Sequence, residues 1–304
     1  MFRYILRKIL VAILTVFAMA TITFFLLKLI PGDPFASLKT SQEIQDLQRA
    51  YYGLDKPVIQ QYFTYMGNLL QGNLGISMKH LGKNVYDIIA ATFPVSAKLG
   101  LIAFVFAELL GIAFGIVCAQ FKGRWPDYIL LLIAVAGIAI PTMVLGPLLR
   151  YWLGVKLHVL PSTGWGEARQ IIMPAFVLGL SIMAAEIRSM RTSMVGVLSE
   201  DFITAARAKG MNRLEIMWHH ELKNSLIPIL TNMGVTLSGI LMGSFIVEKI
   251  FLIPGLGEYY VNSVMELDYP LIMGLSIFYG SLLVGMNLIV DILYGLVDPR
   301  IRVK

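Results

Sequence analysis

The sequence predicts an all-α membrane protein that crosses the bilayer several times. Of its 304 residues, 57% are hydrophobic and only 14% are charged, whereas soluble domains average about 25% charged residues. Six apolar runs approach or exceed the roughly 20 residues that a transmembrane helix needs. They cover approximately residues 9–30, 98–120, 128–151, 171–189, 226–247 and 270–293. We therefore expect six transmembrane helices.

The first run is expected to stay in the protein as a transmembrane helix, residues 1–30. Basic residues precede it, and Ala18–Ala20 resembles the small-residue cleavage site of a signal peptide. However, the apolar character continues past Ala20 to Ile30. The apolar part of a signal peptide covers only about 7–15 residues, so this run has the length of a span.

The basic residues set the expected orientation of the helices. With the N-terminus in the cytoplasm, Lys and Arg residues gather in cytosolic segments near 3–8, 122–124, 188–223 and 300–304, as the positive-inside rule requires. Six spans then place both termini in the cytoplasm. Because the net charge of +6 is divided between apolar runs and forms no solvated basic domain, we expect no nucleic-acid partner.

Two prolines, Pro141 and Pro147, interrupt the third run. Proline is tolerated in transmembrane helices where neighbouring helices or water satisfy the freed carbonyl groups. The sequence therefore predicts a kink in one continuous helix at this point, and not two separate helices.

Residues 31–92 are expected to form a small extracytoplasmic cap. Prolines at positions 31 and 34 end the first helix, because proline cannot continue the hydrogen-bond ladder. A polar helical stretch (41–52), a turn (53–57) and an amphipathic run (58–70) follow. The segment is rich in aromatic residues, namely Tyr51, Tyr52, Tyr62, Phe63 and Tyr65, so we expect it to fold.

The most informative stretch is the polar segment 201–228, which separates two apolar runs. Its first part has Phe202, Ala205, Ala206 and Lys209 at the i, i+3, i+4, i+7 spacing of one helix face. Gly210 is expected to end this helix, because glycine readily adopts the left-handed conformation. A second short helix is indicated by Leu214, Met217, Trp218 and Leu222. Two short helices at an angle would form an elbow that docks a soluble subunit, or alternatively an amphipathic loop that lies on the membrane surface.

This segment resembles the cytosolic coupling loop of the permease subunits of bacterial ABC importers. The motif of that loop is Glu-Ala-Ala, three residues, Gly, nine residues and Ile-x-Leu-Pro. Ala205, Ala206, Gly210 and Leu222 match it, while Thr204, His220 and Lys223 replace the Glu, Ile and Pro. These departures are similar to the peptide branch of the importers, in which T-A-R-A-K-G is usual.

Other stretches resemble the B permeases of oligopeptide importers. They are RYILRK at residues 3–8, P-G-D-P at 31–34, F-P-V-S-A-K-L-G at 93–100, L-I-P-G-L-G at 252–257 and V-D-P-R at 297–300. Their order and their positions relative to the apolar runs make the resemblance extend over the whole chain.

The resemblance implies the type I ABC importer permease fold, with a core at residues 93–293, a coupling loop at about 200–223 and a cytosolic tail at 294–304. It implies a multi-pass protein of the bacterial cytoplasmic (inner) membrane that forms half of an oligopeptide pathway and works by alternating access. The expected partners are a second homologous permease, two ATP-binding subunits, an extracytoplasmic peptide-binding protein and membrane lipid. The residues expected to dock onto the ATPase are Thr204, Ala205, Ala206, Arg207, Lys209, Gly210, Leu214, Trp218 and Leu222.

Polar residues inside the apolar runs are candidates for lining the pathway or for bonding helices together. They are Glu108, Asn232, Asn287 and Asp291. A carboxylate at the bilayer centre costs about 2.5–3.5 kcal/mol, so such groups usually face the bundle interior. Glu186 is close in sequence to Arg188 and Arg191 and is expected to form an interfacial ion pair. The membrane carboxylates are expected at different depths.

No motif for catalysis or nucleotide binding is present. The sequence lacks GxxxxGK[ST], GxSxG and GxGxxG, and its four histidines lack the HExxH spacing. We expect no catalytic residue, metal ligand or cofactor in this chain, with ATP and Mg²⁺ bound by partner subunits. The lone Cys118 is expected to be a small buried hydrophobic residue.

Permeases for other cargo and two other classes of membrane protein are alternatives. A nickel, glutathione or dipeptide permease of the same branch would share most of these features. An intramembrane enzyme would need polar residues that converge at one depth, and an ungated channel would not need the elbow.

Overall fold

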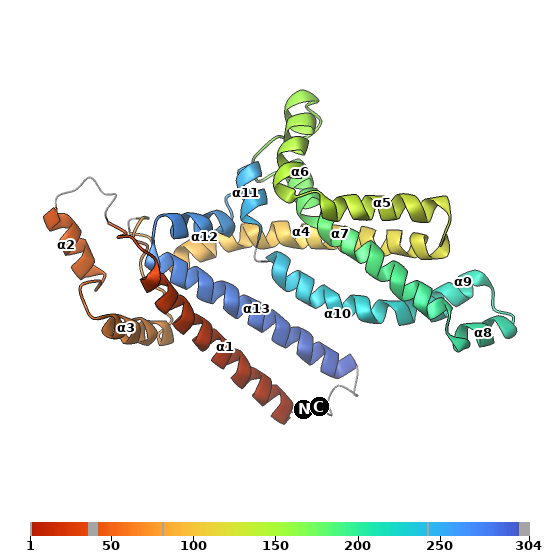
Figure 1. Ribbon diagram of the computed structural model, residues 1–304, viewed down its shortest axis with the longest axis horizontal. Coiled ribbons are helices and arrows are strands. Elements are labelled where there is room, and N and C mark those ends of the chain that lie inside the picture. The colour runs from red at the N-terminus through yellow and green to blue at the C-terminus, as the bar shows by residue number, and fades with distance from the viewer. Residues whose placement is uncertain (1, 36–41, 81, 242, 298–304) are drawn as a thin grey trace. The chain divides into compact units, whose positions relative to one another are not determined.

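The computed structural model describes residues 2–35, 42–80, 82–241 and 243–297, and most of these are helical (Figure 1). No β-strand occurs among them; one isolated bridge pairs Ile76 with Asn84. The all-α prediction is therefore confirmed. The chain divides into two compact units, residues 1–94 with 255–288 and residues 95–254 with 289–304.

The first unit contains the cap and the helices that carry it. Its elements are α1 (Phe2–Leu29), α2 (Gln42–Tyr51), α3 (Val58–Leu70), α12 (Leu256–Met265), the start of α4 (Val85–Gln120) and most of α13 (Tyr269–Val297). The positions of α2 and α3 confirm the helices predicted in the cap; Ser41 lies outside the described residues. A cluster centred on Phe24, Met66 and Met273 packs α3 against α1 and α13.

The loop before α4 is fixed to the start of α13 by one buried carboxylate. Asp268 accepts hydrogen bonds from the Ser77 hydroxyl (2.5 Å) and from the Met78 backbone N–H (3.0 Å). In addition, the Lys79 ammonium donates to the Pro34 carbonyl (2.6 Å). A buried carboxylate that is satisfied in this way stabilises one loop conformation, so the cap is a folded element.

The second unit contains the remaining helices. They are the end of α4, α5 (Trp125–Ala139), α6 (Thr142–Leu149), the π-helical η1 (Arg150–Lys156), α7 (Ala168–Leu198), α8 (Asp201–Ala208), α9 (Arg213–Ile216), the π-helical η2 (Met217–Glu221), α10 (Leu222–Leu241) and α11 (Phe245–Phe251). Helix α7 packs against both α5 and α10 (Figure 1). The Arg191 guanidinium on α7 donates to both carboxylate oxygens of the buried Asp127 on α5, at 2.7 and 2.8 Å.

Four described helices are long and apolar enough to cross a membrane alone: α1, α4, α7 and α13. Two further stretches qualify if each bent pair is one span, α5 with the α6–η1 helix and the two halves of the 213–241 helix. The described residues thus contain four to six candidate spans. The predicted six corresponds to the upper number.

The prediction of one kinked helix in the third run is wrong. Helix α5 ends at Ala139, and the helix that starts at Thr142 is inclined to it by 103°. Pro141 has no N–H to donate and restricts its predecessor, and Ile140 accordingly has an extended conformation, with ψ 115°. Pro147, in contrast, lies within α6.

The fifth run is also divided. It was expected to reach residue 247, but α10 ends at Leu241 and α11 begins at Phe245. Gly243 has φ +80°, which is a left-handed conformation that favours glycine. The Ser244 hydroxyl then caps α11 by accepting a hydrogen bond from the Val247 N–H (3.4 Å).

Candidate functional site

The polar segment after α7 folds as an elbow, defined here as Asp201–Glu221. Its first arm, α8, ends at Ala208, and Gly210 has φ +81°, as predicted from the glycine. The second arm starts with a reciprocal cap in which the Asn212 side chain accepts from the Glu215 N–H and the Glu215 carboxylate accepts from the Asn212 N–H, at 2.9 and 2.8 Å. Gly210 and the reciprocal cap therefore fix the turn between the two arms through local interactions.

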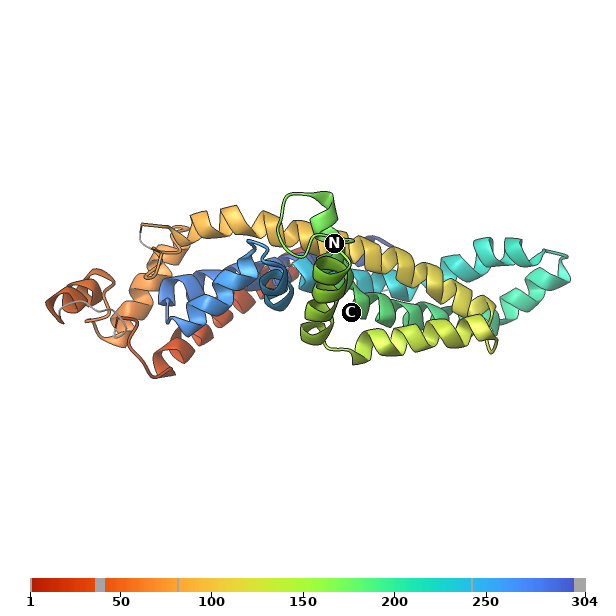
Figure 2. The same ribbon diagram turned by 90° about the horizontal axis from the view of Figure 1, so that it is seen from above.

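The second arm is not a separate short helix. The helix α9 covers four residues and then continues through η2 into α10 without a break. Figure 2 shows the elbow projecting beyond the end of α4 and the start of α5. A force applied to the elbow would consequently be passed along the helix backbone as far as Leu230, beyond which α10 is bent by 43°.

The elbow has a small core of its own. Ile203, Ala206 and Ile216 are buried together, with Val197 and Met211 partly covering them. Ala206 therefore packs inside the elbow and is not part of its exposed surface. Leu222 is half-buried in a different cluster, against α7. The other predicted docking residues are exposed: Thr204, Ala205, Arg207, Lys209, Gly210, Leu214 and Trp218.

Three large apolar side chains of the elbow are exposed. Leu214 is 66% exposed, Trp218 62% and Phe202 40%. Exposed large apolar side chains on a segment outside the apolar runs commonly mark a contact with another protein. The elbow thus exposes these apolar side chains together with the cations Arg207 and Lys209.

A polar network joins the elbow to the end of α4. The Gln120 amide donates to the buried Glu221 carboxylate (2.7 Å). The Arg213 guanidinium donates to the Gln120 side-chain oxygen (2.9 Å) and to its backbone carbonyl (2.8 Å). These residues line a cavity of about 490 Å³ together with Ala119, Leu198, Arg207, Met211 and Ile216. Gln120 therefore connects the start and the end of the elbow's second arm to a transmembrane helix.

Neither Gln120 nor Glu221 stands out in the sequence as a functional residue. Gln120 is the last residue of an apolar run, and Glu221 is one of several charged residues in a polar segment. Their pairing across 101 positions depends on tertiary packing, and no local pattern indicates it.

Two membrane carboxylates lie together in the second unit. Glu108 and Glu186 are both buried, and a Cβ added at Gly111 would lie 2.6 Å from the Glu186 Cβ. The glycine thus allows α7 to approach α4 one turn from Glu108. Among the described residues, neither oxygen of Glu108 has a hydrogen-bond partner. The expectation that the carboxylates lie at different depths is wrong for this pair.

The predicted ion pair of Glu186 with a neighbouring arginine is also wrong. Arg191 binds Asp127, and Arg188 is exposed whereas Glu186 is buried. The remaining polar candidates, Asn232 and Asn287, are exposed on this single chain. Asp291 belongs to α13, but its side chain lies outside the part that the structure describes.

Comparison with known proteins identifies the family of this chain. Residues 111–303 match the binding-protein-dependent transport system inner membrane component, and residues 1–100 match the N-terminal region of such membrane components. The chain belongs to this family. The dipeptide transport system permease protein DppB of Lactococcus lactis is 40% identical over 302 residues, covering 99% of this chain and all of that protein.

Two further relatives cover the chain equally well. The oligopeptide transport system permease protein OppB of Escherichia coli K12 is 40% identical over 305 residues, covering 99% of this chain and all of that protein. The dipeptide transport system permease protein DppB of Bacillus subtilis is 39% identical over 303 residues, covering 99% and 98%. The matches therefore include the cap, the elbow and the spans.

Family membership establishes the general role. The chain is a multi-pass transport component of the inner membrane and not an enzyme. A binding-protein-dependent system implies an external binding protein and ATP-hydrolysing partners. In the described part of the chain, no cluster of three or more His, Cys, Asp or Glu residues could hold a metal ion.

Proposed function

We propose that this chain is the permease subunit of an ABC importer that carries peptides from an external binding protein into the cytoplasm. The support for peptide cargo is that relatives with 39–40% identity over the whole chain are named as dipeptide and oligopeptide permeases. We therefore propose that the cargo is peptides, both short and longer, and not nickel or glutathione.

The observation that carries the coupling mechanism is the exposed apolar surface of the elbow. We propose that Thr204, Ala205, Leu214 and Trp218 contact a partner ATPase, while Ala206 and Leu222 support them from inside. Two ATP-binding subunits would hold ATP and Mg²⁺, and a second homologous permease would complete the pathway. In this arrangement six spans place both termini and the elbow in the cytoplasm, and residues 31–92 cap the outer side.

The geometry suggests how motion reaches the membrane. When the ATPases close, they move the elbow, and the helix from Arg213 to Leu230 transmits that displacement into the first part of α10. The bonds of Gln120 to Glu221 and Arg213 transmit it to α4. Such rigid-body motion between two packed arrangements is how a distant site biases a helix bundle.

Neighbouring alanines in α8 allow a matched test of docking. Ala205 is exposed, whereas Ala206 is buried in the elbow core. Single cysteines would be placed at either position in a Cys118→Ala background, and the assembled complex would be treated with a short thiol crosslinker. We expect Ala205→Cys to crosslink to the ATPase and Ala206→Cys to give little product. No crosslink from either Ala205→Cys or Trp218→Cys would contradict the docking proposal.

Cargo is tested separately with the complete complex in vesicles. ATP hydrolysis should rise when the external binding protein is loaded with peptide, and labelled peptide should accumulate. Stimulation by nickel-loaded or glutathione-loaded binding protein, without a response to peptide, would contradict peptide cargo while leaving the coupling mechanism intact.

A further inference from the structure

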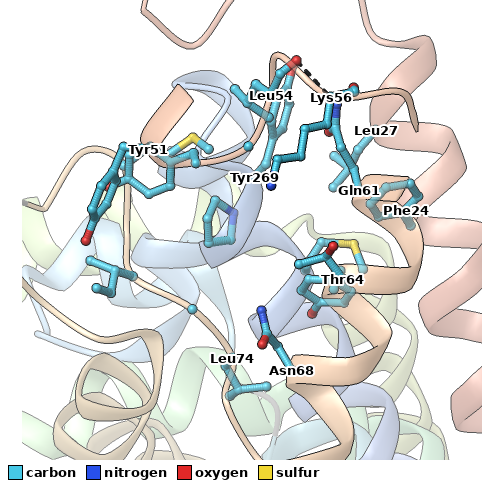
Figure 3. Close-up of a pocket in the computed structure, with 18 of the residues that line it drawn as sticks. Phe24, Leu27, Tyr51, Leu54, Lys56, Gln61, Thr64, Asn68, Leu74 and Tyr269 are labelled. Atoms are coloured by element: carbon cyan, nitrogen blue, oxygen red, sulfur yellow. Dashed lines mark hydrogen bonds between the residues drawn. The ribbon is translucent and has the colours of Figure 1, made fainter. Parts of the chain in front are cut away.

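The first unit contains a cavity of about 310 Å³ that the transport mechanism does not use. It lies between the end of α1, the start of α13 and the cap helices α2 and α3. Figure 3 shows labelled side chains around it, with Tyr51 on one side, Gln61 and Phe24 on the other and Asn68 below. A cavity of this size is large enough for a small ligand.

The cavity has a positive wall. Its lining includes Lys28 and Lys56 and no Asp or Glu residue. The Lys28 ammonium donates to the Gln61 side-chain oxygen (2.6 Å) and lies 5.0 Å from the centre of the Tyr269 ring and 5.5 Å from that of Phe24. None of the ion pairs between described residues includes Lys28. The lysine is thus half-buried and has no carboxylate partner in the described part of the chain.

A second donor in the cavity wall has no partner. The Tyr65 hydroxyl is buried, and among the described residues nothing forms a hydrogen bond with it. Leaving a buried hydroxyl unpaired costs about 1–3 kcal/mol. The wall thus contains an ammonium, a hydroxyl without a partner and the Asn68 amide, which are the kinds of donor that an oxygen-rich anion accepts from.

The surroundings of the cavity indicate where this anion comes from. In α2 the exposed apolar residues Ile44, Leu47 and Tyr51 recur at helical spacing. In α3, Ile59 and Phe63 are exposed one turn apart. Such amphipathic helices lie in the headgroup layer of a membrane. Lys28 is in the last turn of α1, where a lysine side chain reaches the headgroups from a span.

We propose that this cavity binds the phosphate-bearing headgroup of a membrane phospholipid, with Lys28 and Tyr65 facing the phosphate. The bound lipid would attach the cap to the outer leaflet. The apolar walls formed by Phe24, Leu27 and Met273 suit the glycerol and the first acyl carbons. A peptide fits less well, because its ammonium group would meet no carboxylate in the wall.

The test uses the permease purified with its partner subunits. After removal of lipid with detergent, phosphatidylglycerol is added and bound lipid is counted by native mass spectrometry. Lys28→Gln should retain about fivefold less lipid than the wild type, since one lysine near anionic lipid contributes about 1 kcal/mol. Lys28→Arg should restore binding. Lys122→Gln, which removes an exposed lysine of the second unit, should bind like the wild type.

A second variant and two competitors make the result decisive. Tyr65→Phe removes only one oxygen, which has no partner among the described residues, and should lower lipid retention without lowering the melting temperature. This matters if Lys28→Gln fails to assemble. Inorganic phosphate should compete only weakly, because it lacks the apolar part of the ligand. Equal retention by both variants and the wild type would overturn the proposal, and so would displacement of the lipid by free phosphate or by a tripeptide at equal concentration.

Discussion

At the scale of single residues, Gln120 bonds to two charged side chains, Arg213 and Glu221, that are far from it in the sequence. Its side-chain amide N–H donates a hydrogen bond to the buried Glu221 carboxylate, and its side-chain oxygen accepts one from the Arg213 guanidinium. Glutamine is suited to this position because it has both a donor and an acceptor. A carboxylate at this position would repel Glu221, and a basic side chain would repel Arg213.

We predict that Gln120→Leu weakens both the fold and the coupling. The substitution takes a hydrogen bond from a buried carboxylate, which costs about 2 kcal/mol. The melting temperature of the purified complex should fall, and peptide uptake should fall with it. The double variant Gln120→Leu/Glu221→Gln should recover part of the lost stability, because the uncompensated charge is gone. A Gln120→Leu complex that melts and transports like the wild type would show that the network has no such role.

Asp33 illustrates the same reasoning in the cap. Its carboxylate accepts a hydrogen bond from the Phe35 N–H (3.0 Å) and pairs with Arg49. Burial by itself raises the pKa of Asp33, but the Phe35 hydrogen bond and Arg49 lower it by more, so the pKa lies below its ordinary value of 3.8.

The stability that Asp33 contributes should therefore depend on acidity. Because its pKa is lower in the folded protein, the contribution is complete well above pH 3.8 and is lost as the pH falls through the folded value. We predict that Asp33→Asn lowers the melting temperature near neutral pH by about 2–4 °C. The difference from the wild type should disappear in acid. A difference that is the same at every pH would exclude the charge as its cause.

At the scale of elements, the elbow shows what local sequence can specify. Gly210 predicts the end of α8, because only glycine adopts φ near +80° at little cost. The helical spacing in α8 also predicts which residues share a face, but not which of them is covered. Ala206 is covered because Ile216, ten residues later, packs on it, and this contact depends on how the two arms meet.

We predict that Gly210→Val uncouples transport. A side chain in the left-handed conformation costs about 1–2 kcal/mol, so the elbow should shift to another conformation and uptake should fall about tenfold. Membrane insertion should be unchanged, because the spans are not altered. Gly196→Val is the control: both glycines have open space around a new Cβ, but only Gly210 has a positive φ. Equal uptake by the two variants would contradict a rigid elbow.

At the scale of the whole molecule, the open question is on which side of the membrane each segment lies. We predict that cysteines replacing Asp55 or Lys156 react with a membrane-impermeant maleimide in intact cells. Cysteines replacing Lys122 or Lys209 should react only after the cells are permeabilised. All four positions are exposed, and the buried Cys118 is replaced by Ala to remove background. Labelling of Lys209→Cys in intact cells would place the elbow outside and contradict coupling to a cytosolic ATPase.

The sequence by itself determined the features that depend on neighbouring residues. These are the apolar helices of membrane-crossing length, the two cap helices, the glycine that ends α8, and the motifs that indicated the family. Each of these features depends on the spacing of nearby hydrophobic residues or on the conformations open to a single residue. Spacing and residue type can both be recognised along the chain.

Only the tertiary structure decided which residues meet. Arg191 pairs with Asp127 and not with Glu186, Glu108 lies near Glu186, and Gln120 reaches the elbow. It also decided that α5 and α6 diverge by 103°. These results follow from the rotation and approach of helices that are distant in sequence, and side-chain periodicity along one helix holds no information about its neighbours.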